Sequence, residues 1–349
     1  EVQQAFAGYV YGDSTCGQRT VYDVGMSGIP VFNLTNYCAS GSSALFLARQ
    51  AVEAGVVECA LAIGFEEMKP GALASAWSDR TLPVGWIYEC QQKLAPELPQ
   101  DAPRAIKAFG SAGWEYINRY GANPDIFAKV AVKSRNHAMN NPYALFTKPL
   151  TVEEVMGATQ MYPYLTRLMA CPPTCGAAAA IVCSEAFARR HGITTAIEIA
   201  GQALTSVTEA SKTDLINLVG ADMTRRAARQ VYEQAGGGPE DVDVVELHDC
   251  FTPNEVISYE GLGLCPEGGA EKFINDGDNT YGGKYVVNPS GGLMSKGHPL
   301  GATGLAQCTE LVWHLRGTAG KRQVEGARVA LQHNIGLGGA CVVTMYQRA

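Results

Sequence analysis

Two stretches of this chain are similar although they lie far apart in it. CASGSSAL at 38–45 aligns with HPLGATGL at 298–305, with glycine on glycine, hydroxyl on hydroxyl and leucine on leucine. Each opens a helical pattern that ends in glycine, and each helix leads to a strand-like run that begins Ala-Leu. The chain therefore predicts two copies of one α/β unit, with a pseudo-twofold axis that brings the two helix starts together. Because Cys38 faces His298 in the alignment, the repeat also predicts a Cys/His pair there.

Length and composition limit the classes of protein to which the chain can belong. Its 349 residues exceed one small core and favour about two domains. With 46% hydrophobic and 17% charged residues, the composition excludes a disordered chain. A net charge of -7 argues against a general nucleic-acid binder, which needs a basic surface. No run approaches the ~18 uninterrupted apolar residues of a membrane-spanning helix.

Strand-like and helical patterns alternate along most of the chain, which predicts an α/β fold. Residues 1–68 and 171–194 form one half, the second piece of which opens with GAAAAIVC as a buried strand, and 195–349 form the other half. Between them, 69–170 loses periodicity, and we expect an inserted, loop-rich domain there. The chain opens without a signal-peptide pattern, as if in the middle of a domain, and does not end in a Ser-Lys-Leu peroxisomal address.

The eleven cysteines are spaced irregularly. An odd, irregular set argues against a disulfide framework and for a reducing compartment, in which most cysteines act as small core hydrophobes. Cys38 has a different local sequence, because it precedes a predicted helix and is surrounded by small residues. The positive end of that helix would favour a thiolate, and its N–H groups would bind an oxyanion. The alternative is a structural cysteine at a close-packed helix start.

Three further segments place polar groups where a ligand can approach. His298 stands in a glycine-rich loop and can take a proton from a thiol, although a structural histidine in a tight turn is the alternative. His248, Asp249 and Cys250 follow the apolar run VDVVEL, at the carboxyl end of a strand where α/β sheets place their sites. No second ligand cluster has a suitable spacing, so a metal site is disfavoured. The glycines after Asn334 offer bare N–H groups or mark a bulge.

Together these segments resemble the thiolase superfamily. NYCASG at 36–41 matches its nucleophile loop, GHPLGATG at 297–304 its histidine loop, and NIG at 334–336 its C-terminal glycine loop. The tetrad HDCF at 248–251 is similar to that of the sterol carrier protein type, whereas most thiolases have Asn-Glu-Ala-Phe there. The similarity covers essentially the whole chain.

The resemblance implies a five-layer αβαβα fold of two similar halves, with an inserted region over the active site. By the same resemblance, Cys38 is the acylated nucleophile, His298 activates it, and Cys250 is the acid/base thiol. His248 and His298 would polarise the thioester oxygen. The N–H groups of Cys38 and Gly336 would form a second oxyanion hole.

The chain departs from the family pattern at two places. Most thiolases carry a second reactive cysteine where this chain has Asn334, which we expect, with Asp249, to support the reacting groups. Cys250 and Cys308 are the candidates to replace that cysteine, and we favour Cys250 because Cys308 lies well inside a helix and should face the core. The family also normally has a strand and helices ahead of these segments, so the first half-sheet is expected to lack a strand.

The activity implied is that of a 3-ketoacyl-CoA thiolase in fatty-acid or sterol side-chain β-oxidation, which releases acetyl-CoA or propionyl-CoA and a shortened acyl-CoA. Coenzyme A is then a substrate, and no cofactor or metal is expected. A homodimer is the implied assembly, and the peroxisome the implied compartment, with the mitochondrion as alternative. A condensing β-ketoacyl synthase-like enzyme is the nearest rival, although it has no use for the thiol of Cys250. A non-catalytic lipid carrier with a thiolase fold is the rival from another class.

Overall fold

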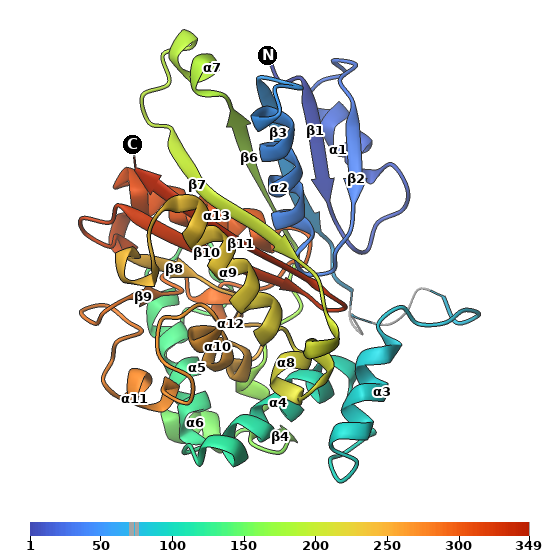
Figure 1. The fold of residues 1–349 in the computed structure, drawn as a ribbon, viewed down its shortest axis with the longest axis vertical. Helices are drawn as coiled ribbons and strands as arrows, with labels where there is room; N and C mark the ends of the chain where they lie inside the picture. The colour runs from blue at the N-terminus through green and yellow to red at the C-terminus, as the bar shows by residue number, and fades with distance from the viewer. Residues whose placement is uncertain (70–72, 74–76, 349) are drawn as a thin grey trace.

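The computed structural model describes residues 1–69, 73 and 77–348, and its chain forms two large mixed β-sheets with helices between and around them, and a small two-stranded sheet (Figure 1). The strands are β1 (Gln4–Gly8), β2 (Val31–Leu34), β3 (Cys59–Glu66), β4 (Gln160–Tyr162), β5 (Leu165–Thr166), β6 (Gly176–Cys183), β7 (Ile197–Thr205), β8 (Val244–Glu246), β9 (Val286–Val287), β10 (Val329–Gly336) and β11 (Ala340–Arg348). The helices are α1 (Cys16–Val24), α2 (Ser40–Glu53), α3 (Gly85–Leu94), α4 (Arg104–Tyr120), α5 (Asp125–Ala138), α6 (Val152–Met156), α7 (Glu185–Arg190), α8 (Leu215–Leu218), α9 (Ala221–Ala235), α10 (Thr252–Gly261), α11 (Ala270–Asn275), α12 (Gly292–Ser295) and α13 (Thr303–Arg316).

The two sheets repeat one topology. The first has the order β2-β1-β3-β6, and the second β7-β11-β10-β8-β9. In each sheet, one strand (β3 or β10) pairs in parallel with the strand on one side, β1 or β8. The same strand pairs antiparallel with the strand on its other side, β6 or β11. The internal repeat expected from the sequence is therefore present in the strand order.

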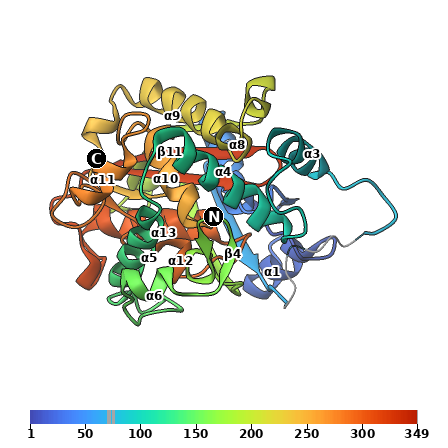
Figure 2. The same cartoon turned by 90° about the horizontal axis from the view of Figure 1, so that it is seen from below.

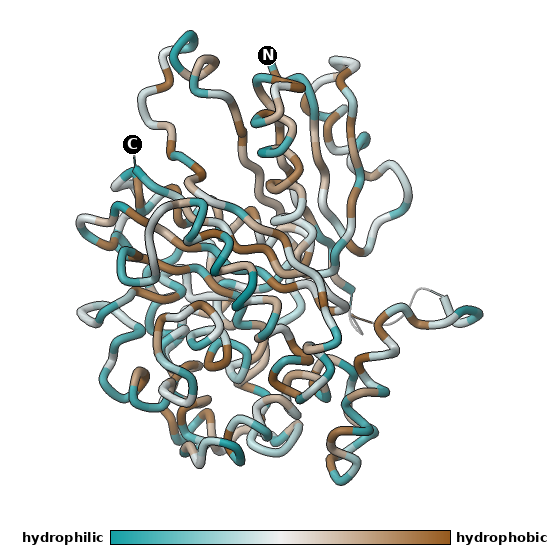
Figure 3. Tube along the Cα trace, in the orientation of Figure 1, coloured by the Kyte–Doolittle hydropathy of each residue, from teal (hydrophilic) through white to brown (hydrophobic). Residues whose placement is uncertain are grey.

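Helices α2 and α13 form the middle layer between the two sheets. Their buried apolar side chains, with those of the facing strands, make one cluster of Leu45, Ala48, Leu305, Leu311, Leu315, Phe6, Ala60, Ala62, Val244 and Ala330, among others. Helix α1 contacts β1 and β2 of the first sheet, and α9 covers β7 and β11 on the outer face of the second. This gives the αβαβα layering that was expected. In Figure 3, hydrophobic stretches follow the interior strands and hydrophilic ones the outer loops.

Glycines permit the starts of α2 and α13 to touch. A Cβ on Gly41 would lie 2.6 Å from the carbonyl oxygen of Gly301, and a Cβ on Gly64 would overlap the same oxygen. A Cβ on Gly301 would in turn overlap the carbonyl of Phe65. Because backbone atoms cannot move aside as a flexible side chain can, these positions need glycine for the two halves to approach this closely.

The inserted region is more regular than the sequence suggested. Helices α3 to α6 occupy it, so the expectation of a loop-rich region was wrong. Helices α4 and α5 pack against α10, and α5 also against α12, whereas α3 packs against α4 and α8, and α6 against α5 (Figure 2). Helix α4 is amphipathic and buries Phe109, Gly110 and Tyr116 among others, so its pattern was present in the sequence and was overlooked between the prolines on either side of it. Residues 70–72 and 74–76 of this predicted insert lie outside the described residues, and the domain boundaries stay a prediction.

Strand β6 is more exposed than predicted. Its run GAAAAIVC was expected to be buried, yet Gly176, Ala177, Ala179 and Ile181 are exposed. Ala178, Ala180 and Val182 alternate with these residues and pack against the middle layer, so the exposed side chains share the opposite face of β6. In addition, β7 pairs with the edge of β11 in the second sheet, but no strand among the described residues pairs with the equivalent edge of β6. The first sheet thus has one strand fewer than the second, as expected.

Two further expectations concern cysteines and membranes. All eleven cysteines are free thiols, and Cys308 is buried in the middle layer, as expected. Among the residues with described positions, no helix is both long and apolar enough to cross a membrane.

The glycine contact between the halves predicts a stability difference between two Gly→Ala variants. Gly64→Ala should lower the free energy of unfolding by about 1–3 kcal/mol, because its methyl group collides with the backbone of Gly301. Gly85→Ala is the matched control, because its Cβ would meet only Leu82 Cβ, at 3.9 Å. Urea titrations of both variants measure the difference. Equal stability would contradict the close packing.

Candidate active site

Three predicted residues come together where α2 and α13 begin. Cys38 lies just ahead of α2, His298 lies between α12 and α13, and His248 follows β8. The Cys38 sulfur and one ring nitrogen of each histidine all lie within 4.8 Å of one another. The two imidazoles meet edge to face with 5.1 Å between ring centroids. The pairing of Cys38 with His298 follows from the contact between the two helix starts.

A strained turn presents the thiol of Cys38. Tyr37 has φ 48°, a left-handed conformation that is uncommon for a residue with a side chain. The Ser40 hydroxyl holds the turn, since it accepts from the Asn36 N–H at 2.8 Å and donates to the Tyr37 carbonyl at 2.6 Å. The Asn36 amide also donates to Ser43 Oγ at 2.9 Å. The small polar residues after the nucleophile therefore fix its backbone.

The protonation state of Cys38 differs from the sequence-based expectation. Burial of the thiol raises its pKa to about 12, although the N–H groups of Cys38 and Leu337 act in the opposite direction. The helix terminus was expected to favour a thiolate, and that prediction was wrong because desolvation outweighs the helix terminus here. The resting residue is a thiol, and it needs a base to become a nucleophile.

The loop between β10 and β11 closes over Cys38. A Cβ on Gly336 would overlap the Asn36 carbonyl, so only glycine permits this approach. The N–H of Leu337 faces the Cys38 sulfur closely enough to lower its pKa. Leu337 thus adds a donor that sequence reasoning did not single out, because any residue supplies a backbone N–H. The oxyanion role of the Gly336 N–H stays a prediction.

His298 is held in the tautomer of a base. Its Nδ1 lies 2.7 Å from Thr303 Oγ1, and the Thr303 hydroxyl donates to the Pro299 carbonyl at 3.0 Å. Because that hydroxyl has one hydrogen, its oxygen accepts from His298 Nδ1–H. Nε2 of His298 is buried without a hydrogen-bond partner and carries the free lone pair. This nitrogen is therefore able to take the proton of the Cys38 thiol.

His248 is held by the neighbouring strand β10. Its Nδ1 lies 2.9 Å from the amide nitrogen of Asn334, and its backbone N–H donates to Nδ1 of His333 at 3.4 Å. The Asn254 amide donates to the His248 carbonyl. His248 is therefore fixed at ring and backbone.

Burial keeps both imidazoles neutral. It lowers the pKa of His298 to about 3, with a smaller contribution from Lys296. It also lowers the pKa of His248, which lies beside His298 and His333. A neutral histidine offers one donor and one acceptor nitrogen, so hydrogen bonding decides which nitrogen faces Cys38.

Asp249 positions the histidine loop. Its carboxyl group accepts from the N–H groups of Leu293 at 2.7 Å and Met294 at 3.3 Å, in the short helix α12 that leads to His298. Burial, with Glu255 nearby, raises the pKa of Asp249 to about 8. A Cβ on Gly292 would overlap this carboxyl group. Asp249 thus supports the site from beneath.

Cys250 lies close to two other thiols. It is buried, and burial together with Cys171 and Cys38 raises its pKa well above the ordinary value, so it rests as a thiol. Cys171 donates its N–H to the Cys250 carbonyl at 2.9 Å and also has a raised pKa through burial and Cys38. Sequence reasoning missed Cys171, and its spacing from Cys175 gave no signal, because the neighbours it meets come from distant segments.

Glu66 is a second residue that sequence reasoning missed. It is buried at the end of β3, and its carboxylate accepts from the N–H groups of Val10 at 3.1 Å, Tyr11 at 2.9 Å and Gly301 at 3.0 Å. It ties the first half to the histidine loop of the second half. An acidic residue that ends an apolar strand was the available signal.

The Cys38, His248 and His298 trio also has the donor types of a metal site. The sequence analysis disfavoured a metal because no ligand cluster had a suitable spacing along the chain. That argument does not apply to these three residues, because they come from three distant segments. The hydrogen bonds of the two Nδ1 atoms to Asn334 and Thr303 do not exclude a metal, because a histidine can ligate through Nε2 while Nδ1 is engaged. The predicted absence of a metal stays a prediction.

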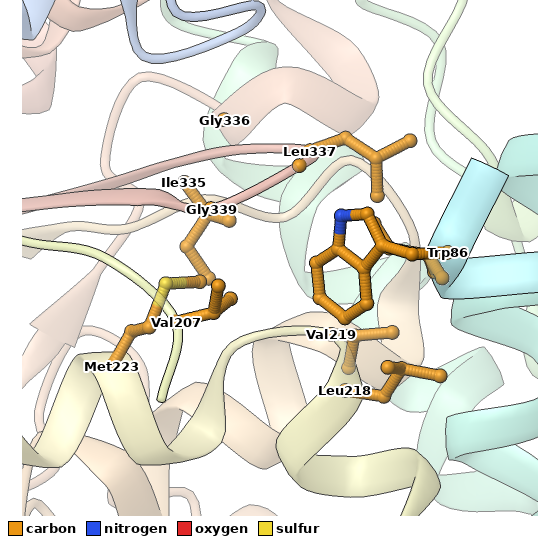
Figure 4. A pocket seen from close by; sticks show the side chains of 11 residues that line it. Trp86, Val207, Leu218, Val219, Met223, Ile335, Gly336, Leu337 and Gly339 are labelled. Atoms are coloured by element: carbon orange, nitrogen blue, oxygen red, sulfur yellow. The ribbon is translucent and has the colours of Figure 1, made fainter. Parts of the chain in front are cut away.

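An apolar pocket lies next to the loop that closes over Cys38 (Figure 4). Its lining is Trp86, Ile87, Val207, Leu218, Val219, Met223 and residues 335–339. Figure 4 shows the Trp86 indole between Leu337 on one side and Leu218 with Val219 on the other. The pocket has no charged residue in its lining, and its volume of about 10 Å³ admits little more than one water-sized group in this conformation.

Comparisons with known proteins agree with this architecture. The family model described as thiolase, N-terminal domain matches residues 2–163, and the thiolase C-terminal domain-like model matches 201–346. Sterol carrier protein 2 of Homo sapiens is 52% identical over 351 residues, which is 99% of this chain and 64% of that protein. The chain thus spans less than two thirds of that relative.

Two other relatives extend the comparison. Benzoylsuccinyl-CoA thiolase subunit BbsB of Thauera aromatica is 37% identical over 344 residues, 97% of this chain and 84% of that protein. A solved structure named Ltp2-ChsH2(DUF35) aldolase superposes with a TM-score of 0.82 at 22% identity, covering 99% of this chain and 87% of that one. At that identity the superposition demonstrates a shared fold.

The raised pKa of Cys38 predicts how its alkylation depends on pH. With a pKa of about 12, the thiolate fraction should rise roughly tenfold per pH unit from pH 6 to 9. The rate of iodoacetamide modification of Cys38, followed by mass spectrometry of its peptide, should rise in proportion without levelling off. A plateau near neutral pH would instead indicate a resting thiolate–imidazolium pair and contradict this assignment.

Proposed function

The chain belongs to the thiolase family, and from this premise we propose that it is a 3-ketoacyl-CoA thiolase of the sterol carrier protein type. It would cleave a 3-ketoacyl-CoA with coenzyme A to acetyl-CoA, or propionyl-CoA from a 2-methyl substrate, and a shortened acyl-CoA. The observation that carries the proposal is the arrangement of one thiol and two neutral imidazoles within 4.8 Å. Such a set supplies a nucleophile, its base and an oxyanion donor at one point.

The first half-reaction acylates Cys38. His298 Nε2 takes the thiol proton as sulfur attacks the C3 carbonyl, and the resulting oxyanion lies against the N–H groups of Cys38 and the 336–337 loop. The C2–C3 bond then breaks, and its electron pair leaves as the enolate of acetyl-CoA. His248 and the now protonated His298 donate to the enolate oxygen. The Cys250 thiol protonates C2, which completes acetyl-CoA and leaves a Cys250 thiolate.

The second half-reaction releases the product. The Cys250 thiolate takes the proton of coenzyme A, and the coenzyme A sulfur attacks the Cys38 thioester. The tetrahedral intermediate collapses to the shortened acyl-CoA, and the Cys38 sulfur recovers its proton from His298. Atoms and protons balance without an oxidant or a bound cofactor. We accordingly propose that coenzyme A is a substrate and that no cofactor or metal takes part.

We propose that an acyl chain enters the apolar lining shown in Figure 4 when the side chains there open. It adjoins the 336–337 loop, so an acyl group on Cys38 would extend toward Trp86 and Val219. The pocket is narrow, and a long or branched chain would require the Trp86 side chain to move. Rates with straight and 2-methyl 3-ketoacyl-CoAs of increasing length would define the preference.

We also propose a homodimer and a peroxisomal location. Strand β2 is an edge of the first sheet, and large apolar side chains are exposed on it and on the preceding segment: Tyr22, Val24, Met26 and Phe32. A second copy would cover such a patch. Sedimentation should give twice the 37.1 kDa chain mass, and Phe32→Lys should shift the measured mass toward that of the single chain.

The peroxisomal location is tested by tagging the protein in cells, which distinguishes the peroxisome from the mitochondrion.

The proposed activity predicts a large effect at Cys38. Incubation with a 3-ketoacyl-CoA should acylate Cys38, and Cys38→Ala should lower kcat for thiolysis by roughly 10³-fold or more, because Cys38 is the thiol that meets both histidines in the part of the chain that the structure describes. Cys308→Ala, a buried cysteine of α13 away from the site, is the matched control and should retain activity. Full thiolysis by Cys38→Ala would reject the mechanism.

The same assay separates the remaining assignments. Cys250→Ala should abolish turnover, whereas Cys171→Ala should reduce it less; the reverse order would move the acid/base role to Cys171. Turnover of malonyl-CoA in place of 3-ketoacyl-CoA would favour the condensing enzyme. Ligand binding that alkylated Cys38 leaves unchanged, with no thioester turnover, would favour the lipid carrier.

A further inference from the structure

A buried chain of hydrogen bonds runs from the last strand of the second sheet to His248. Tyr346 donates its hydroxyl hydrogen to Gln332 Oε1, and the Gln332 amide donates to Ser42 Oγ at 2.9 Å. Ser42 then donates to Asn334 Oδ1 at 2.9 Å, and Asn334 Nδ2 lies 2.9 Å from His248 Nδ1. All five side chains are at most 1% exposed, so water does not compete for these bonds.

The donor direction along this chain is determined at each step. Gln332 Nε2 has two hydrogens, and its two short contacts are with Ser42 Oγ at 2.9 Å and the Gly304 carbonyl at 2.7 Å, whereas Gln307 Oε1 is farther away at 3.5 Å. Ser42 therefore accepts from Gln332, and its single hydroxyl hydrogen is left for Asn334 Oδ1. This fixes which end of the Asn334 amide faces Ser42. The other end, the NH₂ group, must face His248.

The glycine at position 304 makes the chain possible. A Cβ there would overlap Ser42 Oγ and lie 2.9 Å from Asn334 Oδ1. Ser42 belongs to α2 and Gly304 to α13, so the chain crosses the contact between the two helix starts. It therefore exists only where both halves of the protein are docked.

We propose that Asn334, oriented by Ser42 and Gln332, is a positioning residue that locks His248 in the Nε2–H tautomer. An Asn NH₂ group can only donate, so His248 Nδ1 must accept, and burial keeps the ring neutral. The single ring hydrogen is then on Nε2, the nitrogen left to face Cys38 and His298. His248 is a permanent donor, whereas Thr303 holds His298 in the opposite tautomer with a free Nε2 lone pair.

The two tautomers give the two histidines different roles in the site. His298 begins as the acceptor that removes the thiol proton, and His248 begins as the donor that stabilises the enolate oxygen. With both rings in one tautomer, the site would lack either its base or its standing donor. This assignment rests on the proposed thiolase function for its kinetic consequence, but the tautomer itself is independent of the reaction.

Nitrogen NMR of protein labelled with ¹⁵N in histidine tests the tautomer directly, because protonated and bare ring nitrogens differ in shift. The six histidines make few signals, and His248→Asn assigns the one of interest. In the unmodified protein at pH 7, His248 should carry hydrogen on Nε2 and none on Nδ1. Hydrogen on Nδ1 would overturn the proposal, whether or not the protein turns over thioesters.

Two variants test the chain through different links. Asn334→Asp places a carboxylate opposite Nδ1, so the ring should become Nδ1–H or doubly protonated. Ser42→Ala removes the hydrogen that orients the Asn334 amide, and it should give a mixture of tautomers. If either folded variant keeps only the neutral Nε2–H ring, the proposal is wrong. Ser42→Ala keeps the test available if the buried carboxylate prevents folding.

Kinetics give the second readout. Thiolysis by Ser42→Ala should show kcat lowered about 10-fold to 100-fold with KM little changed, because the substrate still binds but the donor is misplaced. For the Asn334→Asp variant, the matched control is Asn279→Asp, because Asn279 is also buried and donates to the Tyr259 hydroxyl at 3.0 Å. An unchanged kcat for Ser42→Ala would overturn the catalytic consequence. Absence of activity in the unmodified protein would reject the proposed function and leave the NMR result to decide the tautomer.

Discussion

The close approach of α2 and α13 is the contact on which the site depends. Glycines at 41, 64 and 301 let two backbones touch where side chains would separate them. That contact brings Cys38 next to His298 and places Ser42 against Asn334. Glu66 reinforces it by accepting the Gly301 N–H from across the two halves. The inserted helices and the β10–β11 loop then pack around a site that the helix contact has already located.

Burial, more than helix dipoles, sets the chemical state of the groups that meet there. It holds Cys38 and Cys250 as thiols and both histidines as neutral rings. Neutral rings can be assigned as donor or acceptor by a single hydrogen bond, and Thr303 and Asn334 assign them oppositely. A solvent-exposed site of the same residues would lose this control, because water satisfies either tautomer.

Several parts of this arrangement could be predicted from the sequence. The repeat around Cys38 and His298 predicted the two-sheet fold and the pairing of its helix starts, since matched segments occupy matched places. The position of His248 and Cys250 after an apolar strand predicted that they would lie at a sheet end. The helices of 69–170 were missed although α4 is amphipathic, because the prolines and irregular segments between the helices interrupt the period over the region as a whole. Strand β6 was misjudged because its apolar composition does not reveal whether a neighbour covers it.

The sequence by itself determined which residue types are available and that two similar units hold them, because local patterns and repeats depend on the chain alone. Only the tertiary structure decided the pKa of Cys38, the arrival of Cys171 and Glu66 beside the site, and the tautomers of two histidines. Each of these depends on desolvation or on hydrogen bonds between residues from distant segments, such as Ser42 and Asn334. Such desolvation and hydrogen bonding arise only when the two halves pack together, so the residues adjacent in the sequence do not determine them.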